Sequence, residues 1–200
     1  MKQKAIIVPD NIDRVLLHAC CAPCSSAIVE WLLNNHIQPT IFYFNPNIYP
    51  ETEYEHRKQE SKRHASSLGI EWIDGDYDHQ SWCAYIAGLE REKERGRRCQ
   101  QCFAYRLKRS AEKAKELGFS YFTTTLASSR WKSLEQINSA GQWAAEQVGG
   151  VRFWAQNWRK DGLQERRQQL LKEYRFYNQL YCGCEFSMPN ADSRLSGSRL

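Results

Sequence analysis

Residues 15–26 read Val-Leu-Leu-His-Ala-Cys-Cys-Ala-Pro-Cys-Ser-Ser, and this stretch decides the fold. Its apolar start, residues 15–17, predicts a buried strand, and the apolar spacing of residues 27–32 predicts the helix that follows. Three cysteines therefore lie in a strand-to-helix turn, where Pro23 is well suited because it lacks an amide proton. In open α/β sheets such a turn opens onto the crevice in which ligands bind.

Four further strand candidates alternate with helix candidates along the rest of the chain. The strand candidates are β-branched or aromatic runs at residues 40–44, 70–73, 121–126 and 151–154. Apolar spacing and glycine stops predict helices over residues 51–68, 101–117, 134–148 and 162–180. This alternation predicts an α/β fold, a Rossmann-like parallel sheet with helices on both faces.

The same pattern sets the expected boundaries. One α/β domain is expected over residues 1–188, and residues 189–200 lack apolar periodicity and predict a loose tail. Residues 76–98 carry no clean periodicity and predict an irregular insertion with a short helix. At the first helix we expect Ser25 or Ser26 to act as the cap.

Composition restricts the class of protein. The chain has 200 residues, of which 42% are apolar, enough for one domain with a buried core. No run approaches the length of a membrane span, and the N-terminus shows no apolar signal segment, so a cytoplasmic location without membrane contact is expected. Eight cysteines in such a chain favour metal binding or redox chemistry over a disulfide framework.

Positive charge is concentrated in one segment. Residues 91–113 hold nine Lys or Arg and three Glu, a net charge of +6, so the remainder carries −1 of the total of +5. A basic block beside cysteines suggests a partner that bears phosphate groups. The alternative is a solvated helix face, which charge runs often form.

Seven of the eight cysteines fall into three groups. They are Cys20, Cys21 and Cys24, then Cys99 and Cys102, then Cys182 and Cys184. The middle pair is expected where a helix opens, and there the helix dipole, with Arg97 and Arg98, would favour thiolate over thiol. A pair of neighbouring cysteines supplies half of the ligands of a metal site. Two such pairs make a set of four thiolates, which either a zinc ion or an iron–sulfur cluster uses. Adjacent Cys20 and Cys21 are unusual for zinc, which favours the cluster.

The pair Cys182-Gly183-Cys184 has a different spacing. Two cysteines separated by one residue close only a small, strained disulfide ring, and strain makes such a bond easier to reduce. We interpret the pair as a two-electron redox couple, against two further metal ligands or two buried thiols. Cys83 stands alone and is interpreted as a small buried hydrophobic residue.

The roles of Cys24 and His18 have more than one interpretation at this point. Cys24 is a metal ligand, a reserve thiol or a group that supports the ligands. His18 is an additional metal ligand, or a supporting group that tunes or protonates the thiol site, or a core histidine bonded to a backbone carbonyl. No glycine-rich phosphate loop follows the first strand.

Together these motifs resemble the epoxyqueuosine reductase QueH family. The matching stretches run in order over nearly the whole chain, at residues 18–23, 44–48, 53–54, 88–90, 96–99, 102–103, 123–126 and 181–184. The resemblance implies a fold similar to the nucleotide α-hydrolase (HUP) group without a working nucleotide loop. It also implies the last step of queuosine biosynthesis, the reduction of epoxyqueuosine in the tRNA anticodon to queuosine.

The resemblance further implies a set of site residues. A four-iron, four-sulfur cluster would be bound by Cys20, Cys21, Cys99 and Cys102. Cys182 and Cys184 would be a redox-active pair or ligands of a further, mononuclear iron. The partners would be tRNA carrying epoxyqueuosine and an unidentified electron donor. The family position of Cys24 is not always cysteine.

A tRNA substrate requires phosphate contacts, and the basic segment flanks Cys99 and Cys102. The candidates for tRNA contact are Arg97, Arg98, Arg106 and Lys132, with ordinary surface charges as the alternative. Two other function classes stay in view. One is a non-catalytic RNA-binding module whose thiolates hold structural zinc, and the other is a sulfur-transfer enzyme, which the missing phosphate loop disfavours.

Overall fold

Strand β1 (Arg14–His18) lies at the centre of a five-stranded parallel sheet in this computed structural model, which describes residues 6–179 and 181–188. Val15, Leu16 and Leu17 are all fully buried, as expected of a parallel strand covered on both faces. The strand order is β3-β2-β1-β4-β5, with β2 (Gln38–Tyr43), β3 (Trp72–Asp74), β4 (Tyr121–Thr124) and β5 (Arg152–Phe153). The predicted tail, residues 189–200, lies outside the described residues.

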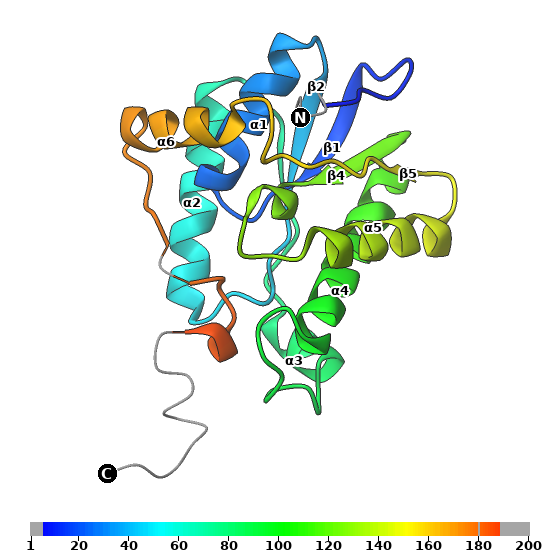
Figure 1. Cartoon of the computed structure of the whole chain (residues 1–200), viewed down its shortest axis with the longest axis vertical. Coiled ribbons are helices and arrows are strands. Elements are labelled where there is room, and N and C mark those ends of the chain that lie inside the picture. Colours follow the sequence, from blue (N-terminus) through cyan, green and yellow to red (C-terminus); the bar gives the residue numbers. More distant parts are fainter. Residues whose placement is uncertain (1–5, 180, 189–200) are drawn as a thin grey trace, which may run out of the picture.

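Helices cover both faces of the sheet (Figure 1). On one side lie α1 (Ala22–Asn34), α2 (Glu51–Ser67) and α6 (Leu163–Glu173), and on the other lie α4 (Arg97–Glu116) and α5 (Leu134–Val148). The short helix α3 (His79–Tyr85) packs against α4. The predicted α/β class, with a parallel sheet and helices on both faces, is confirmed.

Several element boundaries differ from the predicted ones. Helix α4 begins at Arg97 and not at residue 101, because its first turn is polar and therefore carries no apolar signal. Strand β4 ends at Thr124, whose hydroxyl accepts a hydrogen bond from the Leu126 amide and starts the 3₁₀ helix η1 (Thr125–Ser128). The predicted serine cap is wrong, because α1 already begins at Ala22 and the Ser25 hydroxyl donates to carbonyls in its first turn.

Helix α6 ends at Glu173 and not at residue 180. Arg175 adopts a left-handed backbone conformation with φ of 52°, which turns the chain away from the helix axis. The following segment then runs back toward α2, where a short 3₁₀ helix, η2 (Glu185–Ser187), closes the described part of the chain (Figure 1). The last two cysteines lie in this returning segment, which Arg57 of α2 and Tyr49 hold by hydrogen bonds.

The sheet topology creates a crevice at one place. Strand β1 pairs in parallel with β2 on one side and with β4 on the other, so the chain segments that leave β1 and β4 diverge beyond their carboxyl ends. The cysteine-rich turn follows β1, and residues 125–133 follow β4. Within residues 6–179 and 181–188, no helix combines the length and the apolar character needed to cross a membrane.

Candidate active site

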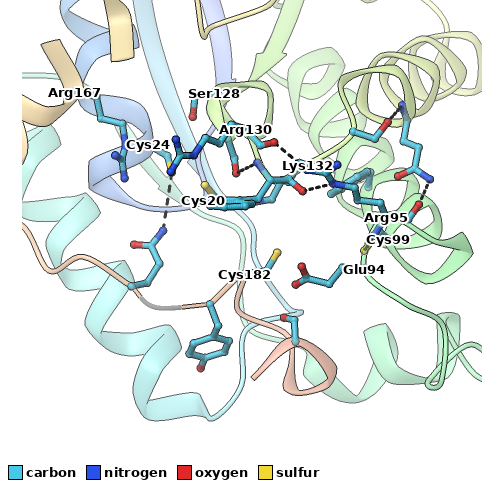
Figure 2. A pocket seen from close by; sticks show the side chains of 18 of the residues that line it. Cys20, Cys24, Glu94, Arg95, Cys99, Ser128, Arg130, Lys132, Arg167 and Cys182 are labelled. Atoms are coloured by element: carbon cyan, nitrogen blue, oxygen red, sulfur yellow. Dashed lines mark hydrogen bonds between the residues drawn. The ribbon is translucent and has the colours of Figure 1, made fainter. Parts of the chain in front are cut away.

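A cavity of about 610 Å³ lies beyond the carboxyl ends of β1 and β4, and four cysteines line it. Figure 2 shows Cys20 and Cys24 on one side, Cys99 on the other, and Cys182 entering between them from the C-terminal segment. Its volume is in the range of small-molecule sites, so it has room for a nucleobase but not for a duplex. The crevice predicted by the fold is therefore a thiol-lined cavity.

Cys20, Cys21 and Cys24 form a compact triad at the start of α1. Their sulfur atoms all lie within 4.8 Å of one another, and Cys20 Sγ is 3.8 Å from Cys21 Sγ. Cys21 takes the N-cap position with extended backbone, which lets two adjacent thiols converge. Two thiolates on one tetrahedral ion, with metal–sulfur bonds of about 2.3 Å, are roughly 3.8 Å apart. The triad therefore has the spacing of ligands to a single metal ion.

The triad is arranged to hold one thiolate. Hydrogen bonds from Cys21 and Cys24 lower the pKa of Cys20, and the Thr125 hydroxyl also donates to Cys20 Sγ at 3.4 Å. The pKa of Cys21 is raised by its interactions with Cys20 and Cys24, and that of Cys24 is raised to about 11. Gln179 Nε2 donates to Cys21 Sγ at 3.0 Å. A metal ion would have to displace the remaining thiol protons, so its binding is expected to strengthen with pH.

Cys99 and Cys102 occupy the first two turns of α4, as their C-x-x-C spacing predicts. The predicted stabilisation of their thiolates by the helix start and Arg98 is outweighed by burial. Burial, together with the neighbouring Cys102 and Cys182, raises the pKa of Cys99 to about 11, although the Arg95 amide donates to Cys99 Sγ at 3.3 Å. Burial also raises the pKa of Cys102. The cost of burying a charge exceeds the benefit of the helix start.

The Cys182-Gly183-Cys184 segment is held against α2 and the preceding turn. Arg57 donates to the carbonyls of Tyr181 and Cys182, and the Tyr49 amide donates to the Gly183 carbonyl at 2.9 Å. Gly183 has φ of +127°, and a Cβ there would lie 3.1 Å from Ile48 and 3.2 Å from the Arg57 guanidinium. Only glycine fits this position without strain.

The two cysteines of this segment face different surroundings and are both free thiols. Cys184 is buried in a cluster with Cys102 and Trp82, and burial raises its pKa to about 12. Cys182 lines the cavity, and its proximity raises the pKa values of Cys99, Cys102 and Cys184. The seven predicted site cysteines thus form the triad and a second group, which we call the four-thiol group: Cys99, Cys102, Cys182 and Cys184.

Most charge around the cavity is positive. Glu94 is its one acidic lining residue among those the structure describes, and the basic lining residues are Arg57, Arg95, Arg130, Lys132 and Arg167. Lys132 lies among the thiols. Burial alone would lower its pKa, but the neighbouring Cys182, Cys20 and Cys24 raise it, so the side chain keeps its positive charge. Lys132 therefore lines the cavity beside the thiols, and its predicted contact with tRNA stays a prediction.

The other three basic candidates lie elsewhere. Arg97 is exposed on α4 but does not line the cavity. The prediction that Arg98 and Arg106 contact tRNA at the surface is wrong, because each is only 2% exposed. Arg98 donates to the carbonyls of Glu90 and Glu92, and Arg106 donates to Asn45 Oδ1. Both arginines hold loops together inside the fold.

The sequence predicted Lys132 in the loop after β4 but not its neighbours Arg130 and Trp131. Trp131 is 67% exposed, and the Arg130 guanidinium lies over its ring, 4.8 Å from the centroid. Arg95 donates to the backbone carbonyls of both residues, at 2.8 and 3.1 Å, and so joins the loop before α4 to this one (Figure 2). The position of the loop in the sequence could have indicated its role, because it follows β4 at the carboxyl edge of the sheet, where ligands bind.

Comparison with known proteins identifies the family. The family model described as epoxyqueuosine reductase QueH matches residues 15–190. The chain is 46% identical over 185 residues to a protein of that name from Haemophilus influenzae, covering 92% of this chain and 76% of the relative. The chain belongs to the epoxyqueuosine reductase QueH family.

Further relatives agree with this assignment. An Acinetobacter baylyi QueH is 45% identical over 96% of this chain and 88% of its own length, and a Thermotoga maritima QueH is 34% identical over 87% and 90%. A crystal structure titled as a predicted subunit of a tRNA methyltransferase from Methanocaldococcus jannaschii is similar with a TM-score of 0.51 and 14% identity. It covers 78% of this chain and 76% of that one, which shows the fold alone.

His18 is a structural residue in this QueH-family chain. Its Nε2 lies 3.0 Å from the Phe44 carbonyl, which only accepts, so Nε2 carries the proton and Nδ1 accepts from the Thr124 hydroxyl at 2.8 Å. Both ring nitrogens are thus occupied by protein groups. The alternative that His18 is a core histidine bonded to a carbonyl is confirmed, and its interpretation as an additional metal ligand is wrong.

The burial of His18 predicts a loss of stability in acid. Burial and the nearby Arg106 lower its pKa to about 3, against 6.5 for an ordinary histidine. Because the unfolded chain binds the proton first, stability is lost as pH falls from 6.5 toward 3, by about 2 kcal/mol between pH 7 and pH 5. Urea unfolding at both pH values measures this. His18→Gln should be less stable at pH 7, but its loss of stability between pH 7 and pH 5 should be about 2 kcal/mol smaller than that of the wild type. An equal loss in the two proteins would contradict the assignment.

Proposed function

We propose that this chain reduces epoxyqueuosine in tRNA to queuosine, the last step of queuosine biosynthesis. The epoxide oxygen leaves as water, and the reaction consumes two electrons and two protons. The observation that carries the proposal is family membership over residues 15–190, and a cavity lined by Cys20, Cys24, Cys99 and Cys182 supports it. The relatives are named for this reaction.

We further propose that the cavity holds iron in two places. The four-thiol group has the number of thiolates that a four-iron, four-sulfur cluster requires, and Cys102 and Cys184 pack in one cluster behind Cys182. The triad has the spacing of ligands to one ion and would hold the further, mononuclear iron. When bound, these groups would supply electrons singly and a Lewis acid for the departing oxygen. This assignment moves Cys20 and Cys21 from the cluster to the single ion.

Protein groups around the cavity fit a splayed-out nucleotide. RNA-binding proteins reach a base by unstacking it, and then hold it on aromatic or guanidinium planes. Trp131, with Arg130 over its ring, offers such a plane at the mouth of the cavity. Lys132 lies deeper, beside Cys20 and Cys182, where positive charge would stabilise the oxygen as it leaves.

The affinity for tRNA is expected to fall with salt concentration, in part because basic side chains that line the cavity contact phosphates. Replacing Arg130 and Arg167 by glutamine removes two positive charges that line the cavity. Each lost phosphate contact reduces the slope of log K against log salt by about 0.7–0.9, so the double variant should lose about 1.5. Filter binding of tRNA from 50 to 300 mM salt, a range chosen to resolve that slope, checks this. The matched control replaces Lys62 and Lys172, which are exposed outside the cavity, and an equal loss there would contradict the placement.

The decisive test of the proposed function is an anaerobic assay. Protein purified without oxygen, or reconstituted with iron and sulfide, is given epoxyqueuosine-containing tRNA and dithionite, and the digested nucleosides are weighed by mass spectrometry. We expect iron and acid-labile sulfide in the protein and conversion to a nucleoside lighter by one oxygen atom. Zinc without sulfide that persists after reconstitution, with no conversion, would overturn the proposal in favour of an RNA-binding module.

A further inference from the structure

A second cluster of metal-ligating side chains lies outside the cavity. His79, Cys83 and Glu185 place one ligand atom each within 4.8 Å of the other two. His79 Nε2 is 3.4 Å from both Cys83 Sγ and Glu185 Oε1, and Cys83 Sγ is 3.9 Å from Glu185 Oε1. None of the three lines the cavity. The proposed reduction uses none of them, and the sequence interpretation gave Cys83 no role.

Two elements bring the cluster together. His79 and Cys83 are one turn apart on α3, at the i and i+4 positions that share a helix face. Glu185 opens η2 and directly follows Cys184, so it comes from the segment that carries half of the four-thiol group. All three side chains are partly buried, with His79 at 19% and Glu185 at 34% exposure. A ligand held here would therefore join α3 to the C-terminal segment.

A hydrogen bond at Nδ1 fixes the tautomer of His79. Its Nδ1 lies 2.7 Å from the Pro46 carbonyl, which only accepts, so Nδ1 carries the proton. The ring also stacks on Tyr49, Tyr77 and Trp82, which fixes its plane. Nε2 is left with a lone pair directed at Cys83 and Glu185. A ring nitrogen that donates to a backbone carbonyl while the other faces a ligand is the usual arrangement of a metal-binding histidine.

The three separations match a tetrahedral ion. With bonds of about 2.0–2.1 Å to nitrogen and oxygen and about 2.3 Å to sulfur, tetrahedral ligand atoms are roughly 3.4 Å (N–O), 3.5 Å (N–S) and 3.6 Å (S–O) apart. The observed values are 3.4, 3.4 and 3.9 Å. Nε2 and the Glu185 carboxylate are both acceptors, so only a cation between them, or a proton, makes this approach favourable.

We propose that His79, Cys83 and Glu185 bind a divalent transition-metal ion of the zinc class, with a water molecule as the fourth ligand. The mixed nitrogen, sulfur and oxygen set suits zinc, and a thiolate with a carboxylate balances the ion's charge. The ion is a structural clip that holds α3 against the segment around Cys184. The alternative occupant is a proton, which would convert the contact into an ordinary His79–Glu185 ion pair.

The test is zinc binding to the full, iron-loaded chain. After anaerobic reconstitution with iron and sulfide, the protein is dialysed against zinc, and zinc, iron and sulfide are counted per chain. Wild type is expected to hold one zinc more than Cys83→Ser, at equal iron and sulfide. His56→Asn, which changes an exposed histidine on α2, should keep that zinc.

A second variant and a second probe keep the result independent of folding. Glu185→Gln preserves shape at a partly exposed position and should weaken zinc binding at least about 10-fold. Cobalt(II) added to the iron-loaded wild type should give a thiolate-to-cobalt absorption band that Cys83→Ser lacks. Equal zinc in wild type, Cys83→Ser and Glu185→Gln, with no such band, would overturn the site and leave the proton as its occupant. This outcome does not depend on whether the chain reduces epoxyqueuosine.

Discussion

Cys182→Ala is expected to lose iron and acid-labile sulfide together, and to lose all detectable epoxyqueuosine reduction with them. Cys182 belongs to the four-thiol group, and its proximity raises the pKa values of Cys99, Cys102 and Cys184. Removing one of four thiolates leaves the proposed cluster with an incomplete ligand set. The measurement is iron and sulfide content with the visible spectrum on anaerobically reconstituted protein, followed by the nucleoside assay.

Cys21→Ala is the matched control, because it removes a thiol of the triad at the same cavity. It should lose iron but keep the sulfide and most of the brown chromophore. A Cys182→Ala protein that keeps full sulfide and colour yet fails to turn over would restore the redox-pair interpretation of Cys182 and Cys184. Loss of sulfide in Cys21→Ala would instead return Cys21 to the cluster.

The turn after β1 could be predicted because its signals are local. An apolar run at residues 15–17, a proline at position 23 and helical spacing beyond it define strand, turn and helix without reference to the rest of the chain. The thiols of this turn also belong together through covalent proximity alone. The structure accordingly places Cys20, Cys21 and Cys24 in one triad at the crevice predicted from the fold.

The grouping of the distant cysteines could not be predicted in this way. Cys102 meets Cys184 only because α6 ends at Glu173 and the chain turns at Arg175, and neither event has a strong sequence signal. Apolar spacing continues past the observed end of the helix, so periodicity alone extends it to residue 180. The path of the chain after α6 decides which cysteine pairs face each other.

The basic residues illustrate the same limit. Arg98 and Arg106 look like surface charges in a basic segment, and yet both are buried. Arg106 is buried because Asn45, 61 residues earlier, supplies an acceptor inside the fold. A buried guanidinium needs such partners, and a sequence gives no sign of a partner that is distant along the chain. Charge density therefore predicted a basic site but not its members.

Lys132→Met is expected to lower kcat for epoxyqueuosine reduction by about 100-fold and to leave KM for tRNA nearly unchanged. The Lys132 ammonium lies among the thiols of Cys20, Cys24 and Cys182, which keep it charged. A fixed positive charge at the point where oxygen departs acts mainly on the transition state, and removing one such group typically costs about 10²–10³ in rate. Single-turnover rates at saturating protein, with tRNA affinity measured separately, check the split.

Lys132→Arg is the matched variant, since it keeps the charge but changes the shape, and it should recover part of the lost rate. Iron and sulfide must equal those of the wild type in both variants, because the lysine is not a proposed ligand. A Lys132→Met protein with weaker tRNA binding and an unchanged kcat would assign Lys132 to a phosphate contact, as its sequence context predicts. A slower step at unchanged affinity would instead place its charge at the departing oxygen, because phosphate contacts stabilise bound substrate and transition state alike.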